Sequence, residues 1–308
     1  MDKKVKIKKS KDNILNRKTT GEKIVFSIFF VLFVLYAVAL LYPVFYLFVN
    51  SFEDGFIYNY NKTSGTHNPF AFPETWHFEN YFEAFKMYAK DSNNNPVYLP
   101  MMYVNSFWIC GLTVFCQIFT CCCTGYVFSK YHFKARNFMY GVIIFTMTIP
   151  IVGASGSMFK LVNDLGTYNT PMHVLTVHLG GLGFNFLVMY GFFSNVSWSY
   201  AEAVFIDGGN DFTAFFKIML PQAKASIMTL CIVAFISEWN DYMSNLMYLP
   251  DYPTVASGLY LITRDAVRDN TVPTSFAALI VSILPMIVLF ICFSDVIMKN
   301  FSVGGLKG

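Results

Sequence analysis

The sequence predicts an all-α membrane protein with six transmembrane helices. Of its 308 residues, 55% are hydrophobic and only 13% are charged, whereas a soluble domain usually carries about a quarter charged residues. A helix needs roughly 20 apolar residues to cross about 30 Å of hydrocarbon. Five uncharged stretches are long enough: 24–52, 92–129, 137–159, 165–201 and 270–294. A sixth stretch, 225–249, qualifies if Glu238 and Asp241 are tolerated within it.

A basic tail, residues 1–23, precedes the first span. It holds nine Lys and Arg, and a basic tail just before an apolar span is typical of a topology signal rather than a nucleic-acid contact. The apolar run 24–49 is too long for a cleaved signal peptide. With six spans both termini share one side, and that side holds 16 of the 22 basic residues. The positive-inside rule therefore predicts that both termini are cytoplasmic.

The six spans can be placed along the chain in order. We expect them at 24–49, 102–129, 138–159, 174–194, 225–249 and 270–294. Pro150 lies near the middle of the third span, where neighbouring helices can satisfy the carbonyl that proline frees. The glycine-rich run 180–183 breaks the fourth span. The spans form a membrane domain, 24–299, with an outer loop at 50–100 that is long enough for a small cap and a cytoplasmic tail at 300–308.

The patterns that would mark an enzyme or a metal site are missing from the sequence. Neither the P-loop pattern G-x-x-x-x-G-K-S/T nor the nucleophile elbow G-x-S-x-G occurs. His173 and His178 lie about 140° apart around a helix. All seven cysteines lie in apolar segments, which favours packing over acylation of Cys121–Cys123. We expect no catalytic residue, no metal site and no cofactor in this chain, and no nucleic-acid partner.

The segment 199–221, between the fourth and fifth spans, predicts two short cytoplasmic helices. Ser199 and Glu202 have the spacing of a capping box at the start of the first helix. Gly208 and Gly209 would end that helix, because glycine adopts the left-handed conformation without a Cβ clash.

The second of these helices would be capped by Asn210 or Asp211. Its apolar residues recur at helical spacing: Phe212, Phe215, Phe216 and Met219. A capped, half-apolar helix pair of this kind either lies against lipid headgroups or docks a soluble partner. The residues alone leave both alternatives open.

The segment 202–221 resembles the EAA loop of binding-protein-dependent ABC importer permeases, whose pattern is E-A-A, three residues, G, nine residues, I-x-L-P. The triplet is Glu202-Ala203-Val204, with valine in place of the last alanine. Gly208 follows after three residues, preceded by the family's aspartate as Asp207, and Ile218-Met219-Leu220-Pro221 follows after nine more. The spacing matches in full, and the bulkier Val204 is the one departure.

Two other segments are similar to carbohydrate-type permeases of this family. The run 238–242, Glu-Trp-Asn-Asp-Tyr, resembles the W-N-D/N segment of the fifth span, and 300–308 resembles the G-x-x-x-G-A/S-V/L-K-G tail of the maltose-type inner subunit. The resemblance implies a type I ABC importer permease fold in the bacterial cytoplasmic membrane, and import of a sugar or oligosaccharide. It also implies a transport subunit that is not an enzyme, since ATP and Mg²⁺ would bind a separate ATPase.

The resemblance further implies the partners and the coupling residues. The partners are a second, homologous permease subunit, two ATPase subunits, an extracellular solute-binding protein, the sugar and the lipid bilayer. The residues implied in coupling to the ATPase are Glu202, Ala203, Asp207, Gly208, Ile218, Leu220 and Pro221. Gly208 and Glu202 would hold the helix shape, Ala203 would permit close approach, and Pro221 would open the fifth span and join it rigidly to the loop.

The two acids of the fifth span, Glu238 and Asp241, are three residues apart and would share one helix face. A charge at the bilayer centre costs roughly 2.5–3.5 kcal/mol, so that face should line water or protein. One interpretation is an anchor at the outer interface, with Trp239 in the aromatic belt and Glu238 paired to Arg264 or Arg268.

The other interpretation places 238–242 on the substrate pathway. Glu238, Asp241 and Asn240 would hydrogen-bond sugar hydroxyls, while Trp239 or Tyr242 would offer an apolar ring face. Alternatives at the level of function are a permease for a non-sugar solute, or a secondary transporter or channel. A transporter would place ionisable residues near the midplane and carry an internal repeat, and neither is clear in this sequence.

Overall fold

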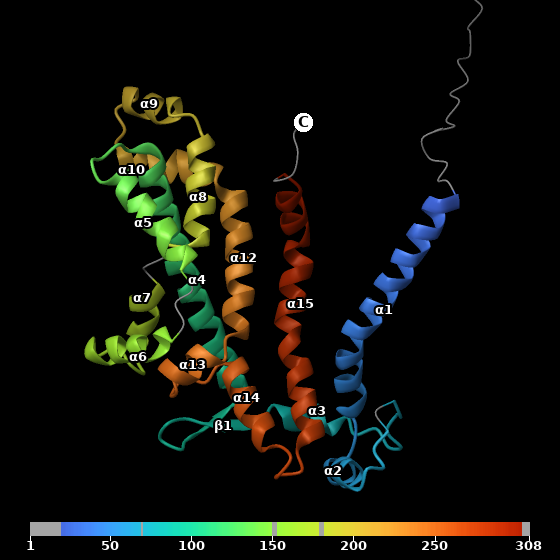
Figure 1. Cartoon of the computed structure of the whole chain (residues 1–308). Coiled ribbons are helices and arrows are strands. Elements are labelled where there is room, and N and C mark those ends of the chain that lie inside the picture. The colour runs from blue at the N-terminus through green and yellow to red at the C-terminus, as the bar shows by residue number, and fades with distance from the viewer. Residues whose placement is uncertain (1–19, 69, 150–152, 179–181, 304–308) are drawn as a thin grey trace, which may run out of the picture.

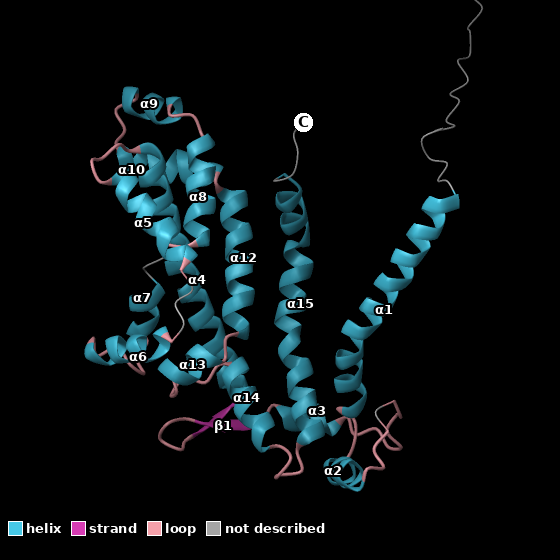
Figure 2. Ribbon diagram, viewed as in Figure 1, coloured by secondary structure: helices cyan, strands magenta, loops and turns pink. Residues whose placement is uncertain are grey.

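The computed structural model describes residues 20–68, 70–149, 153–178 and 182–303, and these are mostly helical (Figure 2). Within this described part, three helices are long and apolar enough to cross a membrane alone. They are α1 (Thr20–Asn50), α4 (Leu99–Lys130) and α15 (Val272–Val303). Figure 1 shows α4 and α15 running along the length of the molecule, with α1 inclined away from them.

The third predicted span is not a single helix. It is occupied by α5 (Arg136–Thr148) and α6 (Ala154–Asp164). Gly153, at the start of α6, has a φ of 85°, a left-handed value that interrupts a helix. The 13 residues of α5 reach only about 20 Å, which is less than the hydrocarbon thickness. Pro150, which the prediction places near the middle of this span, lies outside the described residues.

The fourth predicted span is broken, as expected. The helix α7 (Met172–His178) is separate from α8 (Phe184–Asn195), which begins directly after Gly183; residues 180 and 181 lie outside the described part. The two helices α8 and α4 pack closely, because a Cβ atom on Gly125 would lie 2.9 Å from the Cβ atom of Met189. A small residue at Gly125 is what permits this approach.

The fifth predicted span ends earlier than 249. The helix α12 (Lys224–Asn240) stops where Asp241 leaves helical geometry, with φ −78° and ψ 95°. The Oδ1 atom of Asp241 accepts the N–H of Ser244 at 3.0 Å, and such local bonds compete with helix formation. The short helices α13 (Met243–Tyr248) and α14 (Val255–Asp265) follow. The prediction of a continuous span was therefore wrong, because one of its acids ends the helix.

The outer segment folds into a small layer of its own. It contains α2 (Gly55–Ser64), α3 (Glu79–Ala84) and an antiparallel hairpin of β1 (Tyr88–Lys90) and β2 (Pro96–Tyr98). Asp54 caps α2 by accepting the N–H groups of Phe56 and Ile57. The hairpin turn is closed by Asp91, whose Oδ1 atom accepts the N–H groups of Asn93 and Asn95 at 2.9 and 2.7 Å.

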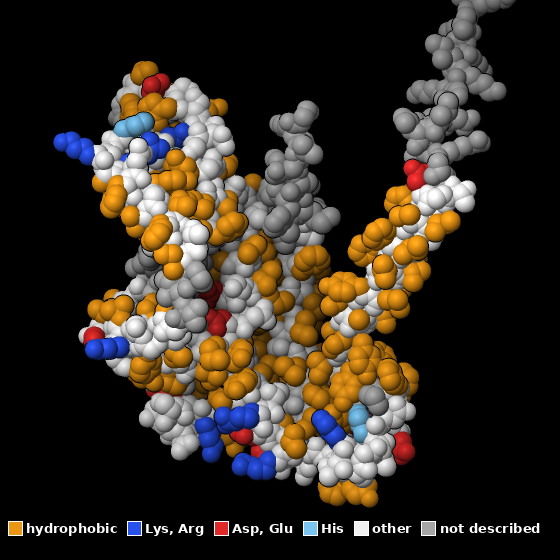
Figure 3. Space-filling view, in the orientation of Figure 1, with side chains coloured by type: hydrophobic (Ala, Val, Ile, Leu, Met, Phe, Trp, Pro, Cys, Tyr) orange, Lys and Arg blue, Asp and Glu red, His pale blue; other side chains and the backbone are white. Residues whose placement is uncertain are grey.

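The ends of the molecule differ in what they carry. The start of α1, the end of α15 and the helix α9 (Ser199–Ile206) lie at one end, and α2, α3 and the hairpin lie at the other (Figure 1). One buried hydrophobic cluster joins the helices packed around the end of α4, and a second cluster joins those packed around its start. Every side chain of α1 from Ile24 to Leu41 is exposed, and Figure 3 shows this helix as largely hydrophobic. A helix with this surface suits a lipid environment.

Candidate functional site

The first helix of the loop, α9, begins differently from the prediction. Its N-cap position is Trp198, which makes no side-chain cap bond. Instead the Ser197 hydroxyl accepts the N–H of Ser199 at 3.3 Å, and the Ser199 hydroxyl lies 2.7 Å from that of Ser197. The predicted capping box of Ser199 and Glu202 was wrong, because Ser199 lies inside the helix and its hydroxyl has a nearer partner.

The end of α9 is as predicted. Gly208 has a φ of 82°, and the N–H of Gly209 donates to the carbonyl of Val204 at 2.8 Å, so the last turn is closed by a residue in the left-handed region. The two glycines are needed for different reasons. A Cβ atom on Gly208 would meet nothing within 4 Å, whereas one on Gly209 would lie 2.5 Å from Cγ1 of Val204.

The second helix begins with Asn210, one of the two predicted caps. Its side-chain oxygen accepts the N–H of Thr213 at 2.9 Å. The helix then runs through α10 (Asp211–Thr213), a π-helical segment η2 (Ala214–Met219) and α11 (Leu220–Gln222). Such π-helical turns are rare and occur frequently at functional sites. Periodicity alone gave no signal for the π segment.

Buried aromatic contacts hold the second helix on the bundle. The Phe215 ring lies 4.9 Å from that of Tyr126 and 6.5 Å from that of Phe193, and Met219 is fully buried. The hydroxyl of Tyr131, at the end of α4, donates to Oδ1 of Asp211 at 2.6 Å. Desolvation, together with this hydrogen bond, raises the pKa of Tyr131. The loop is therefore tied to α4 through both apolar and polar contacts.

The side of the loop that faces away from the bundle carries large apolar side chains that the described part of the chain leaves exposed. They are Tyr200, Phe205, Ile206, Phe212 and Phe216, and Ile206 is 85% exposed. Large exposed apolar side chains of this kind either lie against lipid headgroups or mark a site of interaction with another protein. Figure 3 shows hydrophobic side chains among the few charges at this end.

The structure distributes the predicted coupling residues over both helices. Glu202, Ala203, Asp207 and Gly208 are exposed on or beside α9. In the second helix Ile218 and Leu220 are half-buried and Pro221 is exposed. Sequence reasoning did not single out Ala201, the residue of α9 that is fully buried.

The joint between the loop and the next helix lies beyond Pro221. We expected Pro221 to open the span, but it belongs to α11, and α12 begins at Lys224. The two helical pieces, 211–222 and 224–240, are bent by 73°. Ala223 fills the corner and is fully buried.

The predicted pathway residues at the end of α12 do not all face the same way. Trp239 is only 4% exposed, and its ring lies 5.2 Å from that of Phe107 and 5.7 Å from that of Phe235. Asn240 is exposed, with its amide donating to the carbonyl of Ile236 at 2.7 Å. Trp239 therefore packs inside the protein, which is incompatible with a place in an aromatic belt at the lipid interface.

The predicted pairing of Glu238 with an arginine is wrong. Arg264 pairs with Asp265 at 3.2 Å and Arg268 with Asp269 at 3.3 Å. Each arginine thus forms an ion pair with the aspartate that follows it in the chain. These pairs lie at the end of α14 and beyond it, whereas Glu238 lies in α12.

Glu238 and Asp241 both line a small hollow of about 30 Å³. Its wall also includes Thr113, His173 and Asn245, polar residues that sequence reasoning did not join to the acids. Among the described residues the buried hydroxyl of Thr113 has no hydrogen-bond partner. The His173 ring stacks on that of Tyr248 at 4.8 Å. A space of this size can hold about one water molecule. The sequence signal that could have indicated this hollow is the presence of polar residues inside apolar stretches.

Figure 1 shows α9 and the end of α12, where Glu238 lies, at different parts of the same bundle. Tyr242, after the end of α12, stacks its ring on that of Tyr260 at 4.8 Å.

In the described part of the chain, His, Cys, Asp and Glu form no group of three that could hold a metal ion.

Comparisons with known proteins found matches over most of the chain. The family model described as a binding-protein-dependent transport system inner membrane component matches residues 122–303. The diacetylchitobiose uptake system permease protein NgcG of Streptomyces coelicolor is 26% identical over 281 residues, which cover 90% of this chain and 87% of that protein. The maltodextrin transport system permease protein MalD of Streptococcus pneumoniae is 27% identical over 209 residues, covering 67% of this chain and 74% of that protein.

A solved structure shares the fold. It is that of a bacterial ABC transporter involved in the import of the acidic polysaccharide alginate, and a chain of it matches with a TM-score of 0.73 at 22% identity. The match covers 90% of this chain and 98% of that chain.

Proposed function

Since this chain belongs to the family of binding-protein-dependent transport system inner membrane components, we propose that it is the permease subunit of an ATP-driven importer for a sugar or oligosaccharide. It is a multi-pass transport subunit, and ATP hydrolysis takes place on separate ATPase subunits. The relatives named for diacetylchitobiose and maltodextrin support a carbohydrate substrate. The partners we propose are a second, homologous permease, two ATPase subunits and an extracellular solute-binding protein.

We propose a six-span topology in a bacterial cytoplasmic membrane, with both termini in the cytoplasm. The basic tail would be residues 1–23, the permease domain 24–299 and the last tail 300–308. The position of α9 at the same end as the start of α1 and the end of α15 supports this orientation (Figure 1). In this topology α5 with α6, and α7 with α8, each make one broken span.

The observation that carries the coupling role is the exposed apolar side of the loop 199–221. Its inner side is fixed to α4 by Phe215 and by the bond from Tyr131 to Asp211, so the outer side is presented on a rigid base. We propose that α9 docks on the ATPase through this side. Closure of the ATPase would then move the second helix and, through the bent joint, α12. The proposed coupling residues remain Glu202, Ala203, Asp207, Gly208, Ile218, Leu220 and Pro221.

For the substrate pathway we propose that the residues of 238–242 have two roles, contact with the substrate and support of the residues that make this contact. Glu238 and Asp241 share the polar hollow, while Asn240 and Tyr242 are exposed, so these four are the candidates for contact with sugar hydroxyls or a ring face. Trp239 supports them from behind, since its ring is covered by neighbouring aromatic side chains.

The test of the coupling role uses Gly208. A valine at a φ of 82° is strained by about 1–3 kcal/mol, whereas asparagine tolerates the left-handed region. We expect Gly208→Val to abolish sugar uptake while leaving membrane insertion intact, and Gly208→Asn to retain most of it. Uptake is measured in proteoliposomes that hold the complete complex. Normal uptake by the valine variant would exclude the proposed role of the loop, and a screen of oligosaccharides against the solute-binding protein would identify the substrate.

A further inference from the structure

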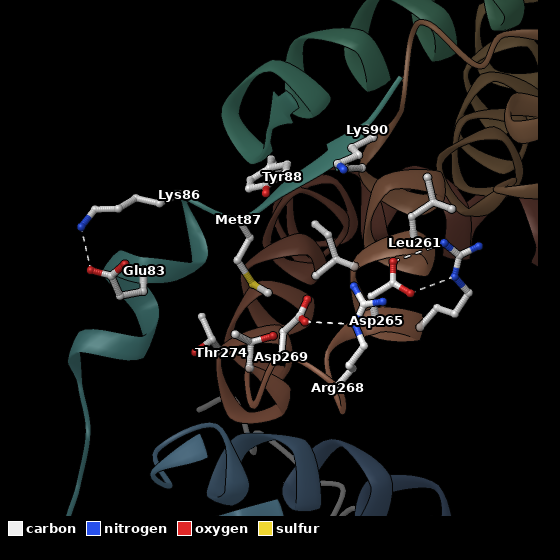
Figure 4. A pocket seen from close by; sticks show the side chains of 14 residues that line it. Glu83, Lys86, Met87, Tyr88, Lys90, Leu261, Asp265, Arg268, Asp269 and Thr274 are labelled. Carbon is white, nitrogen blue, oxygen red and sulfur yellow. Dashed lines mark hydrogen bonds and ion pairs between the residues drawn. The ribbon is translucent and has the colours of Figure 1, made fainter. Parts of the chain in front are cut away.

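A charged cleft of about 570 Å³ opens at the end of the molecule opposite α9. One wall is formed by α3 and β1, and the other by α14 and the start of α15 (Figure 4). The charged side chains lining it are Glu83, Lys86, Lys90, Arg264, Asp265, Arg268 and Asp269. The space-filling view shows a group of blue and red side chains at this end (Figure 3). Neither the transport pathway nor the coupling loop makes use of this charged cleft.

The carboxylates of the charged cleft already have partners within it. Glu83 pairs with Lys86 at 2.6 Å, and the two pairs of adjacent residues in and after α14 lie at 3.2 and 3.3 Å. All these side chains are about half or more exposed; that of Arg268 is 83% exposed. Exposed ion pairs are worth roughly 0–1 kcal/mol. They can therefore be exchanged for contacts with another molecule at little cost.

Lys90 gives the charged cleft a surplus of positive charge. Four basic and three acidic side chains line the cleft. The ion pairs found in the described residues do not include Lys90. Figure 4 shows Lys90 on the strand, across the cleft from the side chains of α14. A surface with excess positive charge attracts a partner of the opposite sign.

The walls of the charged cleft are rigid and partly aromatic. Ala89 and Ile262 are buried in the cluster beneath it, and the N–H of Leu99 donates to the carbonyl of Met87 at 3.0 Å. The ring of Tyr88, which lines the cleft, meets that of Tyr98 on the neighbouring strand edge-on at 5.8 Å. Tyrosine and arginine are enriched at protein interfaces. Because the charged side chains are so exposed, this cleft suits a protruding protein segment better than an enclosed small molecule.

Resting on the proposed function, which makes this end the outer face, we propose that the charged cleft receives an acidic protruding segment of the solute-binding protein. Its carboxylates pair with Lys90 and with Arg268, which gives up its contact to Asp269. The docking keeps the binding protein over the hairpin and α14. This position is distinct from the polar hollow at the end of α12, so docking and substrate contact use different residues.

The experiment measures association of the purified solute-binding protein with the complete complex in lipid nanodiscs. Lys90→Glu and Arg268→Glu are made singly and together, and Lys160→Glu, an exposed lysine of α6 outside the cleft, is the control with the same charge change. We expect the double variant to associate on the order of tenfold more slowly at low ionic strength, with the difference shrinking at high salt. Basal ATP hydrolysis and the Lys160 variant's association rate should match the wild type.

Equal association rates for the double variant and the wild type would overturn the proposal. It would also be overturned if Lys160→Glu slowed association as much as either single cleft variant, because only total charge would then matter. Sugar uptake by the wild-type complex is measured in the same preparation. If the wild type imports sugar but the cleft variants bind normally, the cleft inference alone fails. If the wild type neither binds the protein nor imports sugar, the proposed function fails with it.

Discussion

The contact between Gly209 and Val204 leads to a quantitative prediction about the coupling loop. A Cβ atom on residue 209 would lie 2.5 Å from Cγ1 of Val204 and 3.0 Å from its carbonyl oxygen. Valine is stiff at χ1, so the clash cannot be relieved by a simple rotation. Overpacking of this kind costs about 1–3 kcal/mol. Gly209→Ala should therefore loosen the end of α9, even though it adds only one methyl group.

The assay is limited proteolysis of residues 199–213 in membrane vesicles, together with sugar uptake. When opening and closing are fast, cleavage follows the population of the open form, so the stated cost corresponds to roughly 5- to 150-fold faster cleavage. The second variant, Val204→Ala with Gly209→Ala, removes Cγ1 and should recover most of the protection. Gly191→Ala is the control, because a Cβ atom there meets nothing within 4 Å.

Two results would refute the reasoning. If Gly209→Ala is cleaved at the wild-type rate, the clash is relieved at no cost and the contact is unimportant. If the double variant is cleaved as fast as the single one, the strain does not come from Val204. Equal effects of the substitutions at 191 and 209 would point to a general response to replacing glycine.

Two other predictions concern single hydrogen bonds. Tyr131→Phe removes the donor to Asp211, and because that acid is exposed we expect the free energy that holds the loop closed to fall by less than about 1 kcal/mol. Proteolytic cleavage of the loop should then be up to about fivefold faster. An unchanged rate would mean that the aromatic contacts alone hold the loop in place. The hydrogen bond from the Asn95 side chain, with the N–H groups of the turn, lowers the pKa of Asp91. Because the lowered value belongs to the folded state, this stabilisation is present above the usual aspartate pKa near 3.9 and is lost as the pH falls through the folded-state value. Amide exchange at Asn93 and Asn95, corrected for intrinsic rates, should therefore be protected at neutral pH and lose that protection as the pH falls through the folded-state pKa of Asp91. The Asp91→Asn variant should abolish this pH dependence.

Local features of the loop could be read from the sequence where one residue decides the backbone. Gly208 ends α9 and Asn210 caps the second helix because each acts within three residues of itself. Ser199 failed as a cap because the cap position falls on Trp198, whose ring packs against that of Tyr131 at 5.8 Å. That contact joins segments far apart in the chain, and helical spacing contains no information about it.

The membrane spans show the same limit. Charge spacing located α1, α4 and α15, whose apolar runs are uninterrupted. It failed at 225–249, because Asp241 was counted as a charge to be tolerated, while its side chain bonds the backbone of Ser244 and ends the helix. It also could not show that Glu238 and Asp241 share a hollow with Thr113 and Asn245, since these residues belong to different helices.

The π-helical segment η2 gives the loop an extra residue in one widened turn. A π turn holds more residues than an α turn, so deleting one residue within 214–219 would let the segment become an ordinary α-helix without breaking it. The π turn already absorbs the extra residue, so the side chains beyond it would keep nearly the same direction around the helix axis relative to Phe215. The corner at Ala223 would stay in place, and only the widened turn would be lost. We therefore expect such a deletion to leave the direction of α12 nearly unchanged.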